Sequence, residues 1–256
     1  MSAVSYDEAP PAPDSSVAEE THPSPNHHQR RAGRRPDMLL LHYTGMPTGA
    51  EALARLCDPA SEVSAHYLVF ENGRVLQLVP ESRRAWHAGT GSWDGETDIN
   101  SCSIGIEIVN PGHKGGLPPF PEPQINAVLR LSRDILERWL IRPDRVLAHS
   151  DVAPARKEDP GEMFPWGLLH AAGVGHWVSP APLDERPLHS AESGASALRE
   201  MLAAYGYGFA PTGTDDQATA EVVTAFQRHF RPARVDGMAD ASTIVTLQDL
   251  LRTRPR

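Results

Sequence analysis

The chain has 256 residues, 40% of them hydrophobic, which is enough for one good core and a second, smaller domain. Its formal net charge of −9 argues against a general nucleic-acid-binding protein, since no face rich in lysine and arginine is evident outside residues 30–35. The longest apolar runs, such as MLLL at 38–41, are too short to span a bilayer.

The N-terminus lacks the basic-then-apolar pattern of a secretory signal, and no cysteine suited to lipid attachment lies near Met1. We therefore expect a cytoplasmic protein. The two cysteines, Cys57 and Cys102, form neither a metal-type pair nor a disulfide framework. Both are expected to be free, buried thiols, which suits a reducing compartment.

Two proline-rich stretches divide the chain. Residues 1–35 combine prolines with serines and acids and carry hardly any bulky apolar side chain, so we expect a disordered tail. Residues 179–193 are again rich in proline and poor in apolar residues, which is typical of a linker. These breaks leave a larger domain over residues 36–178 and a smaller one over residues 194–254.

The larger domain opens with the apolar run MLLLHYT at 38–44, whose length favours a strand buried on both faces, with His42 near its exit. The sequence TGAE that follows is a capping box, in which Thr48 and Glu51 would begin a helix. Residues 66–70 and 75–79 then predict a hairpin whose positive φ angles come from the Asn-Gly pair between them.

Residues 103–110 alternate as a strand does, with Ile104, Ile106 and Ile108 on one face and Gly105, Glu107 and Val109 on the other. We expect the second face to be open, because a glycine lies beside the glutamate. Helical spacing over 124–140 predicts that one face buries Ile125, Val128, Leu129, Ile135, Leu136, Trp139 and Leu140. A further strand should end at His149. The mixed order indicates an α/β or α+β domain with a central sheet.

Two histidines at predicted strand ends, His42 and His149, and the loop residue Asp159 match the pattern of a catalytic zinc site. Such a site has three protein ligands and leaves its fourth position for water. On spacing alone, a hydrogen-bonded structural histidine is the commoner explanation for a histidine at a strand end.

Glu107 favours a catalytic site, because a carboxylate on an apolar strand is costly to bury unless something offsets that cost. A general base beside a metal-bound water would explain its position. The alternatives are pairing with an arginine or exposure at a sheet edge. Lys157 could stabilise a developing oxyanion in amide hydrolysis, although a loop lysine is by itself nearly always just solvated.

The stretches LLLHYT, VSAHYLVFENGRVLQLVPESRRAWHAG, NSCSIGIEIVN and HSDVAPARKEDPGEMFPW together resemble one family. It comprises the zinc-dependent N-acetylmuramoyl-L-alanine amidases of the peptidoglycan recognition protein fold, in the branch of the recycling anhydro-amidase and its envelope lipoprotein relative. The resemblance covers residues 38–177. It implies an α/β domain with a central mixed β-sheet flanked by helices.

The resemblance also implies roles for individual residues. Zn²⁺ would be held by His42, His149 and Asp159, with Glu107 as the general base and Lys157 as the cation for the oxyanion. The implied reaction is hydrolysis of the amide between the lactyl group of N-acetylmuramic acid and L-alanine. For the substrate groove we expect His66, Trp86, Asn110 and Arg156, the last meeting a stem-peptide carboxylate. For His66 and Trp86, packing in the core or at the rim is the alternative.

Residues 198–230 and 235–251 resemble the small three-helix peptidoglycan-binding module found on cell-wall hydrolases. Their apolar residues would form a helical core whether or not the module binds anything. The expected partners are peptidoglycan fragments, with no nucleic acid, and the chain is expected to be a monomer. A recognition module that binds muropeptides without cleaving them is one alternative, and a zinc deacetylase of the sugar is another. A wall-binding module also suits the periplasm, which stays an alternative compartment.

Overall fold

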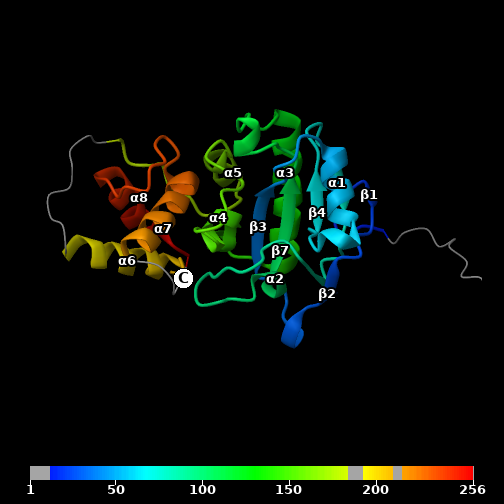
Figure 1. Ribbon diagram of the computed structural model, residues 1–256, viewed down its shortest axis with the longest axis horizontal. Coiled ribbons are helices and arrows are strands. Elements are labelled where there is room, and N and C mark those ends of the chain that lie inside the picture. Colours follow the sequence, from blue (N-terminus) through cyan, green and yellow to red (C-terminus); the bar gives the residue numbers. More distant parts are fainter. Residues whose placement is uncertain (1–11, 184–192, 210–214, 256) are drawn as a thin grey trace, which may run out of the picture.

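The structure, a computed structural model, describes residues 12–183, 193–209 and 215–255. It contains a central sheet with helices on both sides, next to a group of three helices formed by the C-terminal part of the chain (Figure 1). This is the expected α/β class. Among the described residues, no helix has both the length and the apolar character needed to cross a membrane.

The six-stranded sheet has the order β1-β5-β4-β7-β3-β8. The strands are β1 (Glu20–Thr21), β3 (Met38–Tyr43), β4 (Tyr67–Val69), β5 (Val75–Gln77), β7 (Ser103–Ile108) and β8 (Val146–Ala148). Strand β3 lies between β7 and β8 and pairs in parallel with both, whereas β4 and β5 pair antiparallel. The sheet is therefore mixed, as expected.

Strand β3 is buried on both faces because helices cover both. On one face, Leu39 and Leu41 pack with the isoleucines of β7 and with α3 (Glu122–Trp139) in one cluster. On the other face, Met38 and Leu40 belong to a second cluster that includes apolar residues of the C-terminal helices. Helix α1 (Gly49–Cys57) begins at Thr48, whose side chain accepts from the backbone NH of Glu51 as the capping box predicts.

The remaining elements are short connections. They are α2 (Ile99–Cys102), α4 (His149–Val152), α5 (Trp166–Ala171), η2 (Pro59–Ser61), η3 (His113–Gly115) and η4 (Pro143–Arg145). His149 therefore follows β8 as the first residue of a helical turn. Both cysteines are free, but only Cys102 is buried and Cys57 is partly exposed.

Two local predictions need correction. Leu140 is 86% exposed, because it ends α3 in the left-handed conformation with φ 55° and its side chain leaves the helix face. In the hairpin, positive φ occurs at Gly73 and not at Asn72. The Asn72 side chain instead accepts from the backbone NH of Arg74 and stabilises a wider loop.

The expectation of a disordered tail over residues 1–35 is wrong for residues 12–35, while residues 1–11 lie outside the described part. Strand β1 pairs with β5, and β2 (His27–Gln29) pairs with β6 (Arg83–Ala85), ahead of the turn η1 (Arg31–Gly33). The guanidinium of the buried Arg30 donates to the carbonyls of Glu81 and Ser101. Pairing with the sheet and buried polar side chains, with only Ala18 of the segment in the core, order it.

The C-terminal part forms the three expected helices, α6 (Ser193–Tyr205), α7 (Asp215–Phe230) and α8 (Ala241–Thr253). Most of the predicted linker at 179–193 lies outside the described residues. The helices do not stand apart from the larger domain, because Leu202, Phe226 and Leu250 share a core cluster with β3 and β8. Figure 1 shows α7 lying beside α4.

Candidate metal centre and active-site groove

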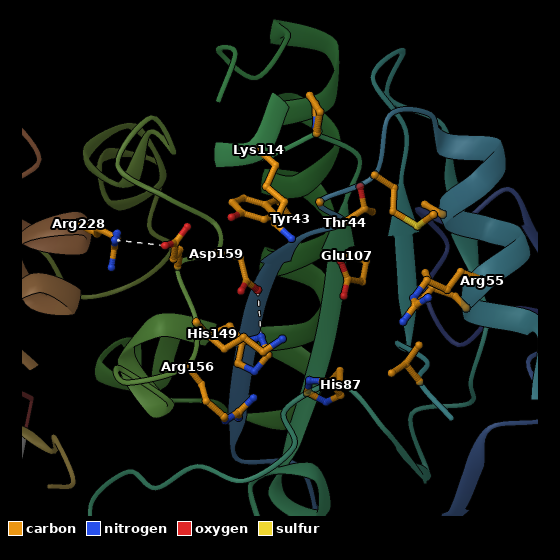
Figure 2. Close-up of a pocket in the computed structure, with 18 of the residues that line it drawn as sticks. Tyr43, Thr44, Arg55, His87, Glu107, Lys114, His149, Arg156, Asp159 and Arg228 are labelled. Carbon is orange, nitrogen blue, oxygen red and sulfur yellow. Dashed lines mark hydrogen bonds and ion pairs between the residues drawn. The ribbon is translucent and has the colours of Figure 1, made fainter. Parts of the chain in front are cut away.

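The three predicted ligands meet at the carboxyl end of the sheet. His42 comes from the end of β3, His149 from the start of α4, and Asp159 from the loop after α4, and all three are buried. The Nδ1 atoms of the histidines lie 2.9 Å apart, and each lies 3.0 Å from Asp159 Oδ2. Figure 2 shows His149 and Asp159 side by side on the floor of the groove. The structure therefore forms the predicted metal-binding cluster.

The hydrogen bonds behind His42 leave its Nδ1 without a proton. The Ser103 hydroxyl donates to the Ile99 carbonyl at 2.6 Å, so its oxygen accepts from His87 Nε2 at 3.3 Å. His87 Nδ1 is then bare and accepts from His42 Nε2 at 3.0 Å. Burial lowers the pKa of His42 to about 4 and that of His87 well below the usual value, so both rings are neutral.

The same argument applies to His149. Its Nε2 faces the carbonyl of Ala88 at 2.9 Å and donates to it, which leaves Nδ1 without a proton whenever the ring carries only one. As a carboxylate, Asp159 offers only acceptor oxygens. Three bare acceptor atoms therefore face one another at about 3 Å, an arrangement that a bound cation stabilises.

Glu107 lies on β7 directly beside His42 in the strand register. Its Oε2 atom is buried and has no hydrogen-bond partner among the described residues. Burial, and next the charge of Asp159, raise the pKa of Glu107 well above its usual value, while Lys157 opposes the shift. An unpaired carboxylate beside a metal cluster is suited to exchange a proton with a ligand.

Lys157 is two residues before Asp159, and its backbone NH donates to the carbonyl of Ala153. Its side chain lines the groove together with Glu107 and Asp159. The ammonium is close enough to influence the pKa values of His42 and Glu107. The structure thus places the predicted cation next to the cluster.

The groove above the cluster has a volume of about 900 Å³. Two of the four residues expected in a substrate groove line it, Trp86 and Arg156. The Trp86 ring is also held from outside by His28, at 4.8 Å between ring centroids. One terminal nitrogen of Arg156 already donates to the carbonyls of Ala88 and Thr90, so only part of its guanidinium is available to a ligand.

The other two residues expected in the groove, His66 and Asn110, do not line it. His66 is fully buried directly before β4, where its Nδ1 accepts from the backbone NH of Gly105 at 2.9 Å. Asn110 is buried too, and its amide donates to the Pro118 carbonyl and accepts from the Gly112 NH, which fixes the loop after β7. Both polar side chains satisfy backbone groups that the sequence does not show, and for His66 this is the packing role named as the alternative.

His87 is a site residue that the sequence reasoning missed. Its ring fills the space over Gly105, where an added Cβ would lie 2.5 Å from the ring. The face that carries Glu107 is therefore not open at Gly105, contrary to expectation. The glycine itself was the available signal, because a strand glycine often marks the close approach of another group.

The C-terminal helix α7 was also missed as part of the site. Glu221, Thr224 and Arg228 line the same groove as Glu107 and Asp159. They follow one another at intervals of three and four residues and so share one face of the helix. The sequence separation of this helix from the other groove residues left no local signal for this contact.

Comparisons with known proteins agree with this geometry. The family model of N-acetylmuramoyl-L-alanine amidase matches residues 32–162, and that of a peptidoglycan binding domain matches residues 192–247. The chain is 41% identical over 230 residues to the N-acetylmuramoyl-L-alanine amidase AmiD of Escherichia coli K12, covering 84% of this chain and 82% of AmiD. It is 32% identical to the 1,6-anhydro-N-acetylmuramyl-L-alanine amidase AmpD of Enterobacter cloacae, covering 58% of this chain and 87% of AmpD.

Solved structures give the same result. AmiD from E. coli, in complex with the substrate anhydro-N-acetylmuramic acid-L-Ala-D-gamma-Glu-L-Lys, matches with a TM-score of 0.76 at 39% identity, over 89% of this chain and 93% of that one. AmpDh3 from Pseudomonas aeruginosa matches with a TM-score of 0.75 at 31% identity, over 100% of both chains. With a matching family model, relatives of this identity and the expected cluster in place, the chain belongs to the N-acetylmuramoyl-L-alanine amidase family.

Proposed function

We propose that the chain is a zinc-dependent amidase that cleaves the bond between the lactyl group and L-alanine in anhydro-muropeptides. The metal is supported by one observation: three acceptor atoms without protons lie next to one another, namely His42 Nδ1, His149 Nδ1 and Asp159 Oδ2. Two nitrogens and one carboxylate oxygen are a typical set for catalytic zinc. The substrate class is supported by the relatives solved with anhydro-N-acetylmuramyl tripeptide and anhydromuramic pentapeptide.

When bound, Zn²⁺ would polarise the scissile carbonyl and lower the pKa of water. Glu107 takes a proton from the attacking water with its unpaired carboxylate and passes it to the leaving amine of L-alanine. Lys157 stabilises the negative charge that develops on the carbonyl oxygen. Trp86 and Arg156 contact the substrate from the walls of the groove.

The reaction is tested by mass spectrometry of the products from a purified anhydro-muropeptide. The proposal expects a free stem peptide that begins with L-alanine. Release of acetate would indicate a deacetylase instead, and binding of the muropeptide without any product would indicate a recognition module.

The site is tested by metal content and turnover measured together. His42→Ala and Asp159→Ala should lose both zinc and activity, because each removes a ligand. Glu107→Ala should keep its zinc and lower turnover by roughly two to four orders of magnitude, the span for loss of a general acid–base group. Full turnover in Glu107→Ala would refute its role.

We also propose that small anhydro-muropeptides are preferred over the intact sacculus, and that the enzyme acts on them in the cytoplasm as a monomer. The first part is supported by helix α7, which closes one side of the groove. Cell fractionation, a comparison of sacculi with small fragments, and sedimentation test the three parts. Protein in the periplasm that cleaves sacculi as readily as fragments would contradict the first two.

A further inference from the structure

The groove has one wall that does not belong to the catalytic domain. Glu221, Thr224 and Arg228 of α7 line it, and Figure 2 shows Arg228 reaching in from the side opposite Arg55 of α1. The opposite face of α7 holds Val222, Val223 and Phe226 in the core shared with the sheet. The orientation of α7 toward the groove is therefore fixed by burial.

Helix α7 is also bound to the helical turn that carries a metal ligand. His229 Nδ1 lies 2.7 Å from Asp151 Oδ2, and the His229 ring stacks on Trp166 at 3.7 Å between centroids. Tyr207, which follows α6, donates to the other Asp151 oxygen at 2.7 Å. Asp151 is in α4 with His149, so this wall keeps a constant position relative to the metal centre.

Arg228 has unused hydrogen-bonding capacity. Its two ion-pair contacts, with Glu158 at 4.0 Å and Glu162 at 3.7 Å, are longer than hydrogen bonds. Both acids lie within hydrogen-bonding distance of His113, at 3.1 and 3.0 Å. Among the described residues the buried Nε of Arg228 has no hydrogen-bond partner, and the side chain is 15% exposed.

The surroundings favour an anionic ligand. Apart from the three metal ligands, the groove is lined by five cations and three carboxylates: Arg55, Lys114, Arg156, Lys157 and Arg228 against Glu107, Glu158 and Glu221. This excess of positive charge contrasts with the net charge of −9 of the whole chain. A planar guanidinium with free donors is the side chain best matched to a carboxylate.

We propose that Arg228, from the peptidoglycan-binding-like helices, binds a carboxylate of the stem peptide, so that these helices form part of the amidase's own substrate site. The inference rests on the proposed substrate class. A γ-linked glutamate leaves its α-carboxylate free, and the last residue of the stem supplies another, so such a ligand always carries the required group.

The test uses the full chain with zinc bound and two substrates, anhydro-N-acetylmuramyl-L-Ala-D-γ-Glu-L-Lys and the same compound with both carboxylates amidated. Arg228→Ala should raise KM for the free-acid substrate about tenfold or more, as expected for loss of a charged hydrogen bond. It should change KM for the diamide little and leave kcat nearly unchanged for both. Arg228→Lys should give an intermediate KM, because charge remains without the planar fork.

The matched control is Arg252→Ala on α8, whose side chain is 75% exposed and does not line the groove. It should leave both KM values unchanged. Equal changes of KM on both substrates in Arg228→Ala, or none on either, would overturn the proposal. If Arg228→Ala does not fold, Arg228→Gln and Arg228→Lys are compared in the same way. A wild type that cleaves both substrates with the same KM also overturns it, whereas a wild type that cleaves neither contradicts the proposed function.

Discussion

His87 controls which nitrogen of His42 is left bare at the metal centre. Its Nδ1 accepts a hydrogen bond from His42 Nε2, and its Nε2 donates one to the hydroxyl of Ser103. That hydroxyl in turn donates to the Ile99 carbonyl. Metal ligands commonly depend on such outer partners for their tautomer and ring orientation. The metal centre therefore includes His87 and Ser103 as well as its three ligands.

We predict that His87→Ala lowers zinc affinity about 10- to 100-fold, the usual cost of losing an outer partner. Gly105→Ala should act in the same direction, because the new Cβ would lie 2.5 Å from the His87 ring and displace it. Zinc affinity is measured by competition with a chelator of known affinity. Unchanged affinity in both variants would contradict this role of His87.

His66 gives a prediction for pH. Burial, and next the charge of Arg30, lower its pKa to about 3, whereas an exposed histidine titrates near 6.5. Between these values the unfolded chain binds a proton that the folded chain does not, so the free energy of unfolding falls as the pH falls from 6.5.

In His66→Gln this slope should be smaller, by an amount that approaches about 1.4 kcal/mol per pH unit near pH 5, where the unfolded histidine is almost fully protonated. Four other histidines with lowered pKa values, His27, His42, His87 and His176, would contribute to the remaining slope. Urea unfolding of metal-free protein between pH 5 and 6.5 measures both slopes. Identical slopes for variant and wild type would show that His66 is protonated in the folded chain.

At the scale of elements, the N-terminal segment supports the site from outside. Strand β2 pairs with β6, and its His28 packs on the groove residue Trp86. Arg30, which follows this strand, donates to the carbonyls of Glu81 and Ser101 and contacts His66 Nε2 at 3.1 Å. The segment is thus part of the catalytic domain in structural terms.

Arg30→Ala should lower the free energy of unfolding by about 3 kcal/mol, because it leaves buried carbonyls of Glu81 and Ser101 without a donor. The matched control is Arg31→Ala, whose side chain is 73% exposed and should change stability by less than about 0.5 kcal/mol. Denaturant unfolding measures both. Equal effects would mean that the burial of Arg30 does not stabilise the fold.

At the scale of the whole molecule, the catalytic domain and the C-terminal helices share one core. Leu40 and Leu147 of the sheet belong to the same cluster as Leu202, Phe226 and Leu250. Arg254, after the last helix, also donates to Asp94 and to the buried Asp144 in the catalytic domain. A boundary that the sequence suggests is therefore not a boundary in packing.

We predict that the full chain unfolds in a single calorimetric transition, with the calorimetric and van't Hoff enthalpies equal. Phe226→Ala should lower the midpoint of that whole transition, since such a truncation costs about 3–5 kcal/mol in a core. Scanning calorimetry measures both. Two separate transitions, with only one of them shifted by the variant, would show that the helices fold independently.

The sequence by itself determined the main strands and helices of the larger domain. Strand β3 could be predicted because both its faces are apolar, and α3 because its apolar residues recur at helical spacing. The metal ligands His42, His149 and Asp159 followed from the resemblance to the amidase family, whereas Glu107 stood out by itself because a carboxylate in an apolar strand is costly to bury without a role.

Only the tertiary structure decided which polar side chains face the groove. His66 and Asn110 turned out to serve backbone groups, His87 to orient a ligand, and Arg228 to enter the groove from another part of the chain. The physical reason is that the role of a polar side chain depends on its partner, and these partners are set by packing. Arg30 and His66 are 36 residues apart, and His229 and Asp151 are 78 apart, so no local pattern joins them.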